Sequence, residues 1–173
     1  FFIAALLASA ATLKSIEGGL KARWMDGRAI TNLSVFHYNY SNIQIIAVDN
    51  ANGAPIQRVV NGRNVKIDGI ELESQFRPID PLTLTANIGL LDAKYGSDIQ
   101  DIGFGPIDLK TIRKDYAPKM TAYVAADYVA GLGEGSGSLT SSGNMTYRSK
   151  MTTSPVDNPI AAQPSYALLD AAI

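Results

Sequence analysis

Two carboxylates in one segment have the spacing of an acid/base pair. Glu71 and Glu73 lie two residues apart in the stretch VKIDGIELESQF, and on an extended chain such side chains share one side at a separation of about 7 Å. Carboxyl pairs at comparable separations hydrolyse glycosidic bonds. Such catalysis needs one desolvated carboxyl group, and a regular open strand leaves both hydrated. The pair therefore indicates a charged surface, and we expect no enzyme.

The other chemistry-bearing residues predict no metal site and no cofactor. The chain has one His and no Cys, which excludes thiolate ligands and a Cys nucleophile. His37 is a single His within a segment that has a strand pattern. Such a His is usually a packed side chain or, in a barrel, one that faces the lumen. Four acidic residues lie in one polar stretch, but they lack the alternating positions of a calcium loop: Asp98, Asp101, Asp108 and Asp115.

Charge and composition restrict the class of protein. The chain has 15 Lys and Arg against 16 Asp and Glu, for a net charge of −1, and a nucleic-acid binder would show a basic patch. With 46% apolar residues the chain is too hydrophobic to be disordered, and its 18% charged residues fall below the roughly 25% of soluble domains. No apolar run reaches the roughly 18 residues of a membrane-spanning helix. A membrane protein is then possible only as a closed β-barrel.

The segment 1–13 differs from the rest of the chain. Its sequence, FFIAALLASAATL, has a hydrophobic run followed by Ala-Ser-Ala, as in a signal peptide, but it lacks a charged start. The alternative is a short helix or frayed strand at the end of an excised piece. We therefore treat 1–13 as an unmatched apolar segment and 14–173 as the folded part.

Turn residues divide the folded part into long segments. Short turn signals at Asp26-Gly27, 77–81 and 131–137 alternate with longer polar stretches at 47–63, 96–116 and 151–164. Between them, polar and apolar residues alternate with a period of two, which indicates strands. We expect seven strands, with a bulge near Phe36, at about 14–25, 28–46, 64–77, 82–95, 117–130, 137–151 and 165–173.

Each expected strand has one polar and one apolar side. The polar side carries Glu17, Lys21, Arg23, Glu71, Glu73, Gln75, Thr83, Thr85, Asn87, Lys119 and Asp127. The apolar side carries Leu20, Ala22, Leu72, Leu82, Leu84, Ile88, Met120 and Val124. This alternation is typical of a sheet that separates two unlike environments.

The expected strands are long, and their connections alternate between short and long. A strand of about 9–11 residues crosses a bilayer core, whereas the usual strand has about 5–6 residues. Short turns on one side and long loops on the other are typical of outer-membrane barrels. The fold class expected is all-β, an antiparallel meander of about seven long strands that forms an incomplete transmembrane β-barrel. The alternative is a secreted or surface β-sandwich that acts as a binding module.

Ordered motifs along the chain resemble those of TonB-dependent outer-membrane receptors. The first is a Glu-x-Gly-x-Lys strand, an Asp-Gly corner and a strand with Phe-x-Tyr-x-Tyr-x-x-x-Gln. The second is Gly-x-Glu-x-Glu followed by Asp-Ala-x-Tyr, and Tyr-Arg-Ser and Leu-Leu-Asp-Ala-x-Ile come after it. The matching residues include Glu17, Gly19, Lys21, Phe36, Tyr38, Tyr40, Gln44, Gly69, Glu71, Glu73, Asp92, Ala93, Tyr95 and Tyr147.

The resemblance covers about 14–173 and corresponds to the C-terminal part of the barrel. The plug domain, the TonB box and the final strands are missing from it, so we expect a partial barrel. It implies import of a scarce ligand, such as a ferric siderophore, across the bacterial outer membrane. The implied partners are outer-membrane lipid and, in the full-length protein, the plug domain and the TonB complex. The imported ligand itself stays unknown.

The resemblance also implies an orientation, in which the short turns are periplasmic, the polar side faces the lumen and the apolar side faces lipid. Trp24 and Phe76 then lie near the periplasmic interface, and Tyr95 and Tyr147 lie towards the outer one. Aromatic rings favour interfaces, where an apolar body meets a polar tip. The alternative is the ordinary enrichment of aromatic residues in strands.

Overall fold

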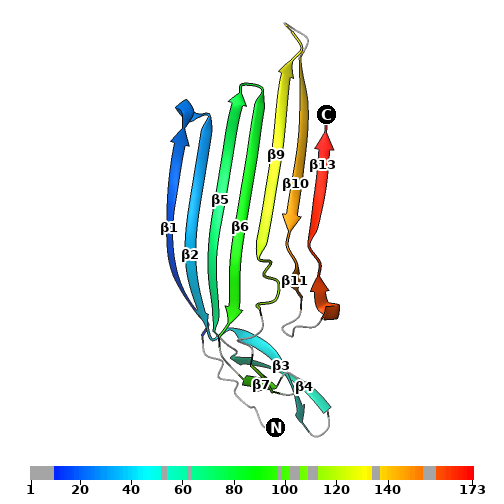
Figure 1. Cartoon of the computed structure of the whole chain (residues 1–173). Coiled ribbons are helices and arrows are strands. Elements are labelled where there is room, and N and C mark those ends of the chain that lie inside the picture. Colours follow the sequence, from blue (N-terminus) through cyan, green and yellow to red (C-terminus); the bar gives the residue numbers. More distant parts are fainter. Residues whose placement is uncertain are drawn as a thin grey trace.

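The alternating pattern produces seven long strands in one sheet (Figure 1). The computed structural model describes residues 10–51, 54–61, 64–96, 99–101, 106–108, 113–133, 137–153 and 159–173. The seven strands are β1 (Thr12–Trp24), β2 (Ala29–Ser41), β5 (Val65–Ile79), β6 (Leu82–Tyr95), β9 (Met120–Gly131), β10 (Ser138–Arg148) and β13 (Tyr166–Ala172). Each pairs antiparallel with the next of the seven, so the predicted meander is confirmed.

The sheet is open at both edges. In the described part of the chain, β1 pairs only with β2 and β13 pairs only with β10. Each edge therefore presents backbone N–H and C=O groups that form no ladder with a neighbouring strand. The sheet is a curved wall and not a closed barrel, as expected.

The three short turns lie at one end of the sheet, at the top in Figure 1. The β1–β2 turn contains the short 3₁₀ helix η1 (Met25–Gly27), in which Asp26 and Gly27 have φ values of 54° and 88°. Gly adopts this left-handed region without steric cost, and Asp tolerates it. Arg28 of this turn binds Asp80 of the β5–β6 turn, with 3.0 Å between Nη2 and Oδ1. The turn residues in the sequence thus determine which end of the sheet carries the short turns.

The long connections at the other end contain strands that the sequence pattern did not predict. They form three small antiparallel hairpins, β3 (Gln44–Ala51) with β4 (Ala54–Asn61), β7 (Ile99–Asp101) with β8 (Pro106–Asp108), and β11 (Met151–Thr152) with β12 (Ala162–Gln163). The last of these includes the 3₁₀ helix η3 (Pro159–Ala161). A hairpin satisfies the backbone groups of an extended loop within the loop itself. These hairpins add to the seven predicted strands, which all lie in the main sheet.

Strand ends also differ from the predicted ones, and the differences have local causes. The strand expected over 28–46 ends at Ser41, because Asn42 adopts a φ of 58° and turns the chain into β3. The strand expected from residue 117 begins at Met120, because Pro118 has no N–H to give to a ladder. The N-terminal strand begins at Thr12, two residues earlier than expected.

The predicted bulge near Phe36 is wrong. The β2–β5 register runs without a break from Ala29 opposite Phe76 to Tyr40 opposite Val65. The irregularity lies instead in the β5–β6 pair, between Phe76 and Ile79, where Pro78 interrupts the hydrogen-bond ladder. Phe36 fits into a regular strand because the residue opposite it is Gly69, which leaves room for the ring.

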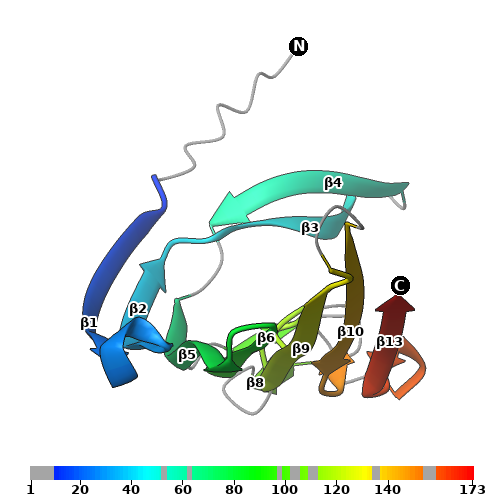
Figure 2. The same ribbon diagram turned by 90° about the horizontal axis from the view of Figure 1, so that it is seen from above.

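The sheet curves, and its polar side is the inner side of the curve. Figure 2 shows the seven strands as an arc seen from above. A Cβ added at the polar-side residues Gly19, Gly69 or Gly89 would come within 3 Å of a neighbouring strand, whereas one at Gly18, on the apolar side, would meet nothing within 4 Å. Side chains crowd on the concave side of a curved sheet and spread apart on the convex side. The convex side is therefore the apolar one.

One small core lies at the long-connection end. Among the described residues, the buried hydrophobic side chains are Val65, Ala93 and Tyr95, with Tyr40 and Ile67 among the side chains that pack against them. A β-sandwich needs a dry core between two facing sheets, and a single seven-stranded layer has none. The sandwich alternative is therefore wrong. No helix in the described residues has the length and apolar character needed to cross a membrane.

Candidate functional site

The concave face brings the predicted polar residues together. Cross-strand pairing places Lys21 opposite Asn32, Asn32 opposite Glu73, and Glu73 opposite Asn87. The same alternation puts further predicted residues on this face: Glu17, Arg23, Glu71, Gln75, Thr83, Thr85 and Asp127. Lys119 lies one residue before β9, and its carbonyl accepts a hydrogen bond from the N–H of Leu91 at 2.9 Å. The predicted polar face is thus continuous from β1 to β9.

A shallow hollow of about 310 Å³ lies at the middle of this face. Gly89 forms its floor between Glu71 and Thr121, because a residue without Cβ leaves space there. Glu73 and Arg148 are among the side chains that line it. Both glutamates are exposed, and the Asn32 side-chain amide donates to Glu73 Oε2 at 3.2 Å. Exposed carboxylates of this kind offer hydrogen-bond acceptors to a bound partner.

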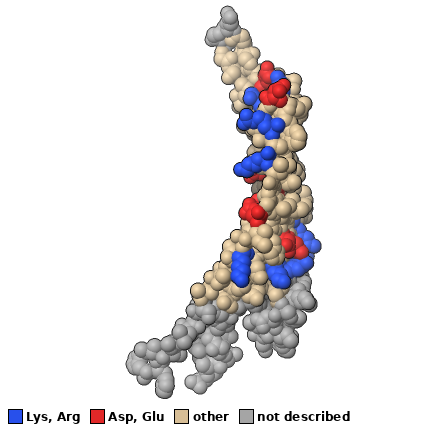
Figure 3. Space-filling model, turned by 90° about the vertical axis from the view of Figure 1, so that its left-hand side faces the viewer, with Lys and Arg blue, Asp and Glu red and all other residues tan. Residues whose placement is uncertain are grey.

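The convex face carries the predicted apolar residues in cross-strand rows. One row is Leu20, Leu33, Leu72 and Ile88, and Ala22, Leu82, Leu84, Met120 and Val124 lie on the same face. Large apolar side chains on this face are widely exposed, with Leu20 at 60% and Trp24 at 55%. Figure 3, which looks at the β1 edge, shows mainly uncharged atoms along one margin of the upper sheet.

The four predicted interface aromatics take different positions. Trp24, Ala29 and Phe76 form one row beside the short turns, and Tyr147 is the second-last residue of β10, towards the long connections. Tyr95 also lies towards the long connections, but it pairs with Val65 on the concave side and is only 8% exposed. Its ring packs in the small core and has little surface free for a membrane interface.

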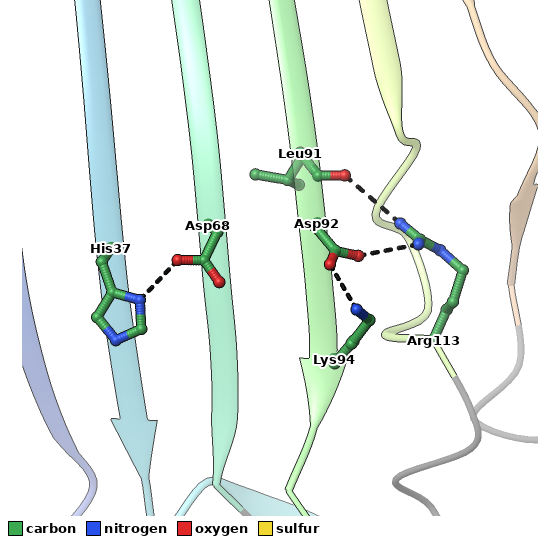
Figure 4. A network of polar contacts seen from close by, with 6 residues as sticks. All are labelled: His37, Asp68, Leu91, Asp92, Lys94 and Arg113. Atoms are coloured by element: carbon green, nitrogen blue, oxygen red, sulfur yellow. Dashed lines mark hydrogen bonds and ion pairs between the residues drawn. The ribbon is translucent and has the colours of Figure 1, made fainter.

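A charged network lies on the convex face at the long-connection end (Figure 4). His37 Nδ1 contacts Asp68 Oδ1 at 2.7 Å across β2 and β5. On β6, Asp92 contacts Lys94 Nζ at 2.6 Å and Arg113 Nη1 at 3.1 Å. His37 is therefore a partner of Asp68 on the apolar face, and the expected lumen-facing or simply packed role does not describe it.

The sequence contains a signal for this network, because three polar residues interrupt the apolar alternation of their strands. His37, Asp68 and Asp92 have the same alternation as the apolar residues Val35, Ile70 and Leu90, so each breaks the apolar pattern at the same level of its strand. Arg113 could not be found in this way, because it belongs to the connection before β9 and reaches Lys94 through a single backbone bridge. Only the fold brings it to the network.

The acidic residues of the connection at 96–116 have separate places in the part of it that the structure describes. Asp98 lies outside the described residues, and Asp101 and Asp108 end β7 and β8. Asp115 accepts a hydrogen bond from the Tyr95 hydroxyl at 2.5 Å and forms an ion pair with Lys114. Within the described ranges, no three His, Cys, Asp or Glu side chains converge on one point.

The Tyr95–Asp115 contact predicts a pH-dependent anchor for this connection. Burial raises the pKa of Asp115, but hydrogen bonds from Lys114 and Tyr95 outweigh burial and lower the pKa below its ordinary value. A lowered pKa in the folded state stabilises the anchor above the unfolded value of about 3.9, and the stabilisation is lost as the pH falls through the folded value. The Lys114 amide donates a hydrogen bond to the Ala93 carbonyl at 3.1 Å. Below the folded-state pKa of Asp115, we expect this amide to lose protection against hydrogen exchange, after correction for the intrinsic effect of pH on the exchange rate.

The matched variant for this measurement is Asp115→Asn, which keeps the shape of the side chain and removes its titration. Protection of the Lys114 amide should be weaker in this variant at neutral pH and should change little with acid. Equal acid sensitivity in the two proteins would contradict the assignment of the anchor to Asp115.

Comparisons with known proteins agree with this geometry. A family model described as TonB dependent receptor-like, β-barrel, matches residues 8–173. The fold is similar to that of the ferric yersiniabactin uptake receptor FyuA from Yersinia pestis, with a TM-score of 0.65 and 18% identity over 92% of this chain. It is also similar to BauA, the ferric preacinetobactin receptor from Acinetobacter baumannii, with a TM-score of 0.64 and 23% identity over 92% of this chain.

A third similar structure is the FrpB iron transporter from Neisseria meningitidis, with a TM-score of 0.64 and 16% identity over 95% of this chain. The chain spans 22% of the length of the first two receptors and 24% of the third. The TM-scores of 0.64 and 0.65 show a common fold, and the part matched is a section of much longer chains.

Proposed function

The chain belongs to the TonB dependent receptor-like β-barrel family, and from that premise we propose that its sheet is a sector of a barrel that imports a scarce ligand. The family consists of transport receptors and not of enzymes, and its barrels sit in the bacterial outer membrane. Of the similar structures described above, two are named as receptors for a ferric compound and one as an iron transporter, and these names support a ferric siderophore as the proposed class of ligand.

The observation that carries the proposal is the contrast between the two faces of a single layer. The convex face exposes large apolar side chains such as Leu20, Leu33 and Leu84 on strands that are mostly 11–15 residues long. Strands of this length cross the hydrocarbon core when they are tilted. Exposing these apolar side chains to water costs free energy, whereas contact with lipid tails does not. We therefore assign the convex face to outer-membrane lipid.

The concave face is assigned to the lumen. Its acceptors and cations, among them Glu71, Glu73, Lys21 and Arg148, are exposed or half-buried and suit hydrogen bonds and ion pairs with a plug domain inside a large barrel. In this proposal the plug domain and the TonB complex belong to the full-length receptor, and the complex supplies the energy for import. The sector contributes the wall against which the plug rests.

The experiment that tests the proposal uses two neighbouring residues of β6 that face opposite sides, Ile88 and Asn87. The chain has no Cys of its own, so single-cysteine variants of the receptor can be labelled in membranes without background from this sector. We expect Ile88→Cys to react with a lipid-soluble maleimide only, and Asn87→Cys to react with a water-soluble one.

The same experiment distinguishes a membrane wall from a protein core. A core would leave both variants unreactive until denaturation, and that result would contradict the proposal. Leu84→Cys and Thr85→Cys repeat the comparison at a second level of the same strand, because Leu84 pairs with Phe76 on the convex side and Thr85 with Gln75 on the concave side.

A further inference from the structure

The irregular segment before β9 is attached to the end of β6 from both sides of the sheet. On the convex side, Arg113 contacts the carboxylate of Asp92 at 3.1 Å (Figure 4). On the concave side, the Tyr95 hydroxyl donates a hydrogen bond to Asp115, whose side chain is 15% exposed. Hydrogen bonds that involve a charged group are stronger than neutral ones. We call residues 113–119 the clasp.

The backbone of the clasp leaves β6 and returns to it. The Lys114 N–H donates to the Ala93 carbonyl at 3.1 Å, and the Leu91 N–H donates to the Lys119 carbonyl at 2.9 Å. The two residues on β6 are neighbours on one side of that strand, whereas the two on the clasp are separated by four others. Extra residues of this kind form a bulge that interrupts the ladder. The bulge carries the residues between Lys114 and Lys119 away from β6.

This bulge contacts the connection that follows β10. The Tyr116 N–H donates to the Thr152 carbonyl at 2.8 Å. Thr152 belongs to β11, which pairs with β12, and the Thr153 N–H donates to the Ala161 carbonyl at 2.8 Å within the same hairpin. The clasp is therefore bonded to two long connections, its own and the one that contains the β11–β12 hairpin.

Tyr116 has a backbone conformation that opposes the closed clasp. Its φ is 56°, in the left-handed region that is unfavourable for a residue with a Cβ. Its side chain is 66% exposed, so packing of the ring contributes little to this conformation. Such conformations persist only where surrounding contacts enforce them. Here those contacts are the bonds of Arg113 and Asp115 to β6 and the bond to Thr152.

We propose that the clasp is a two-state element whose opening releases the connection before β9 and the β11–β12 hairpin together. In the closed state, the bonds of Arg113 and Asp115 to β6 keep Tyr116 beside Thr152. In the open state, Tyr116 returns to an extended conformation and its bond to Thr152 is lost. A molecule that binds either connection in the closed state then stabilises both. The contacts lie within this chain, so the coupling does not depend on which face of the sheet meets lipid.

The experiment measures hydrogen–deuterium exchange of single amides in the purified full-length receptor in nanodiscs, because exchange reports local opening. The two amides are those of Lys114, in the clasp, and Thr153, in the β11–β12 hairpin. Tyr95→Phe removes the hydroxyl that binds Asp115 and keeps the ring in the core. We expect this variant to lower the protection of both amides by a similar factor, about tenfold. Arg113→Gln, which removes the contact on the convex side, should lower both in the same way.

Two controls separate opening of the clasp from a general loss of structure. Tyr40→Phe removes a hydroxyl from the same small core and should leave both amides protected. The Val129 amide, which donates to the Pro81 carbonyl at 2.8 Å near the short turns, should keep its protection in every variant. An equal loss of protection at Val129 would show general unfolding and would contradict the proposal.

A pair of variants at residue 116 tests the strained backbone. Tyr116→Gly and Tyr116→Ala both remove the exposed ring, but Gly adopts the left-handed conformation without steric cost. We therefore expect the protection of Lys114 and Thr153 to be about threefold higher in the Gly variant than in the Ala variant. Equal protection in the two variants would contradict the strain assigned to Tyr116.

Two further results would overturn the proposal. If Tyr95→Phe and Arg113→Gln lower the protection of Lys114 and leave that of Thr153 unchanged, the two connections open independently. If both variants leave the protection of Lys114 unchanged, these contacts do not keep the clasp closed.

Discussion

Replacing Ile88 by Arg should destabilise the assembled receptor by about 2–4 kcal/mol, the cost of a cation on the lipid face of a barrel near the bilayer midplane. Ile88 lies in the middle of the convex row with Leu72 and Ala122 on either side, and the described structure offers no acidic partner in that row. An arginine there must either enter hydrocarbon or distort the strand to reach water. Assembly in the outer membrane should fall accordingly.

The neighbouring substitution Asn87→Arg serves as the matched control. Asn87 lies between Glu73 and Tyr123 on the concave face, where a new guanidinium group meets a carboxylate and water. We expect its cost to be well below that of Ile88→Arg. The two variants are compared by the fraction of protein that runs as a folded, heat-modifiable band and by its midpoint of unfolding in urea. Equal losses in the two variants would show that β6 does not separate lipid from a polar lumen.

Replacing Gly69 by Ala should destabilise the sheet by about 1–3 kcal/mol, the usual cost of overpacking. A Cβ at residue 69 would lie 2.1 Å from Cζ of Phe36, so the ring must leave its place over the β5 backbone. The Phe36 ring also stacks on Tyr38, with 4.7 Å between the ring centroids and 22° between the planes. Moving it therefore disturbs a second aromatic contact. The midpoint of urea unfolding measures the effect.

A double-mutant cycle separates this contact from the general cost of changing a glycine. In the Phe36→Ala background the added methyl group meets no ring, so Gly69→Ala should then cost much less, and the difference is the coupling energy between the two sites. Gly18→Ala is the matched control, because a Cβ at that position meets nothing within 4 Å. An equal cost of Gly69→Ala in both backgrounds would contradict the role assigned to Phe36.

The strands, their order and their two faces were determined by the sequence itself. Alternation with period two is a local property of an extended chain, so residues such as Leu84, Thr85 and Ile88 could be assigned to faces without knowing their neighbours. Short turns at Asp26-Gly27 and 77–81 forced antiparallel neighbours, because no other connection is that short. The fold class and the family resemblance rested on these local patterns.

Register and long-range contacts were decided only by the tertiary structure. The ring of Phe36 keeps β2 regular because Gly69 stands opposite it, and that pairing depends on the alignment of two strands more than thirty residues apart. The chain leaves β2 at Asn42 because the segment that follows, β3, pairs with β4. Lys66, Lys94 and Arg113 were visible in the sequence, but they lie side by side only because the β5–β6 register and one backbone bridge place them so. Local sequence specifies which side a residue faces, whereas the pairing of strands specifies what lies beside it.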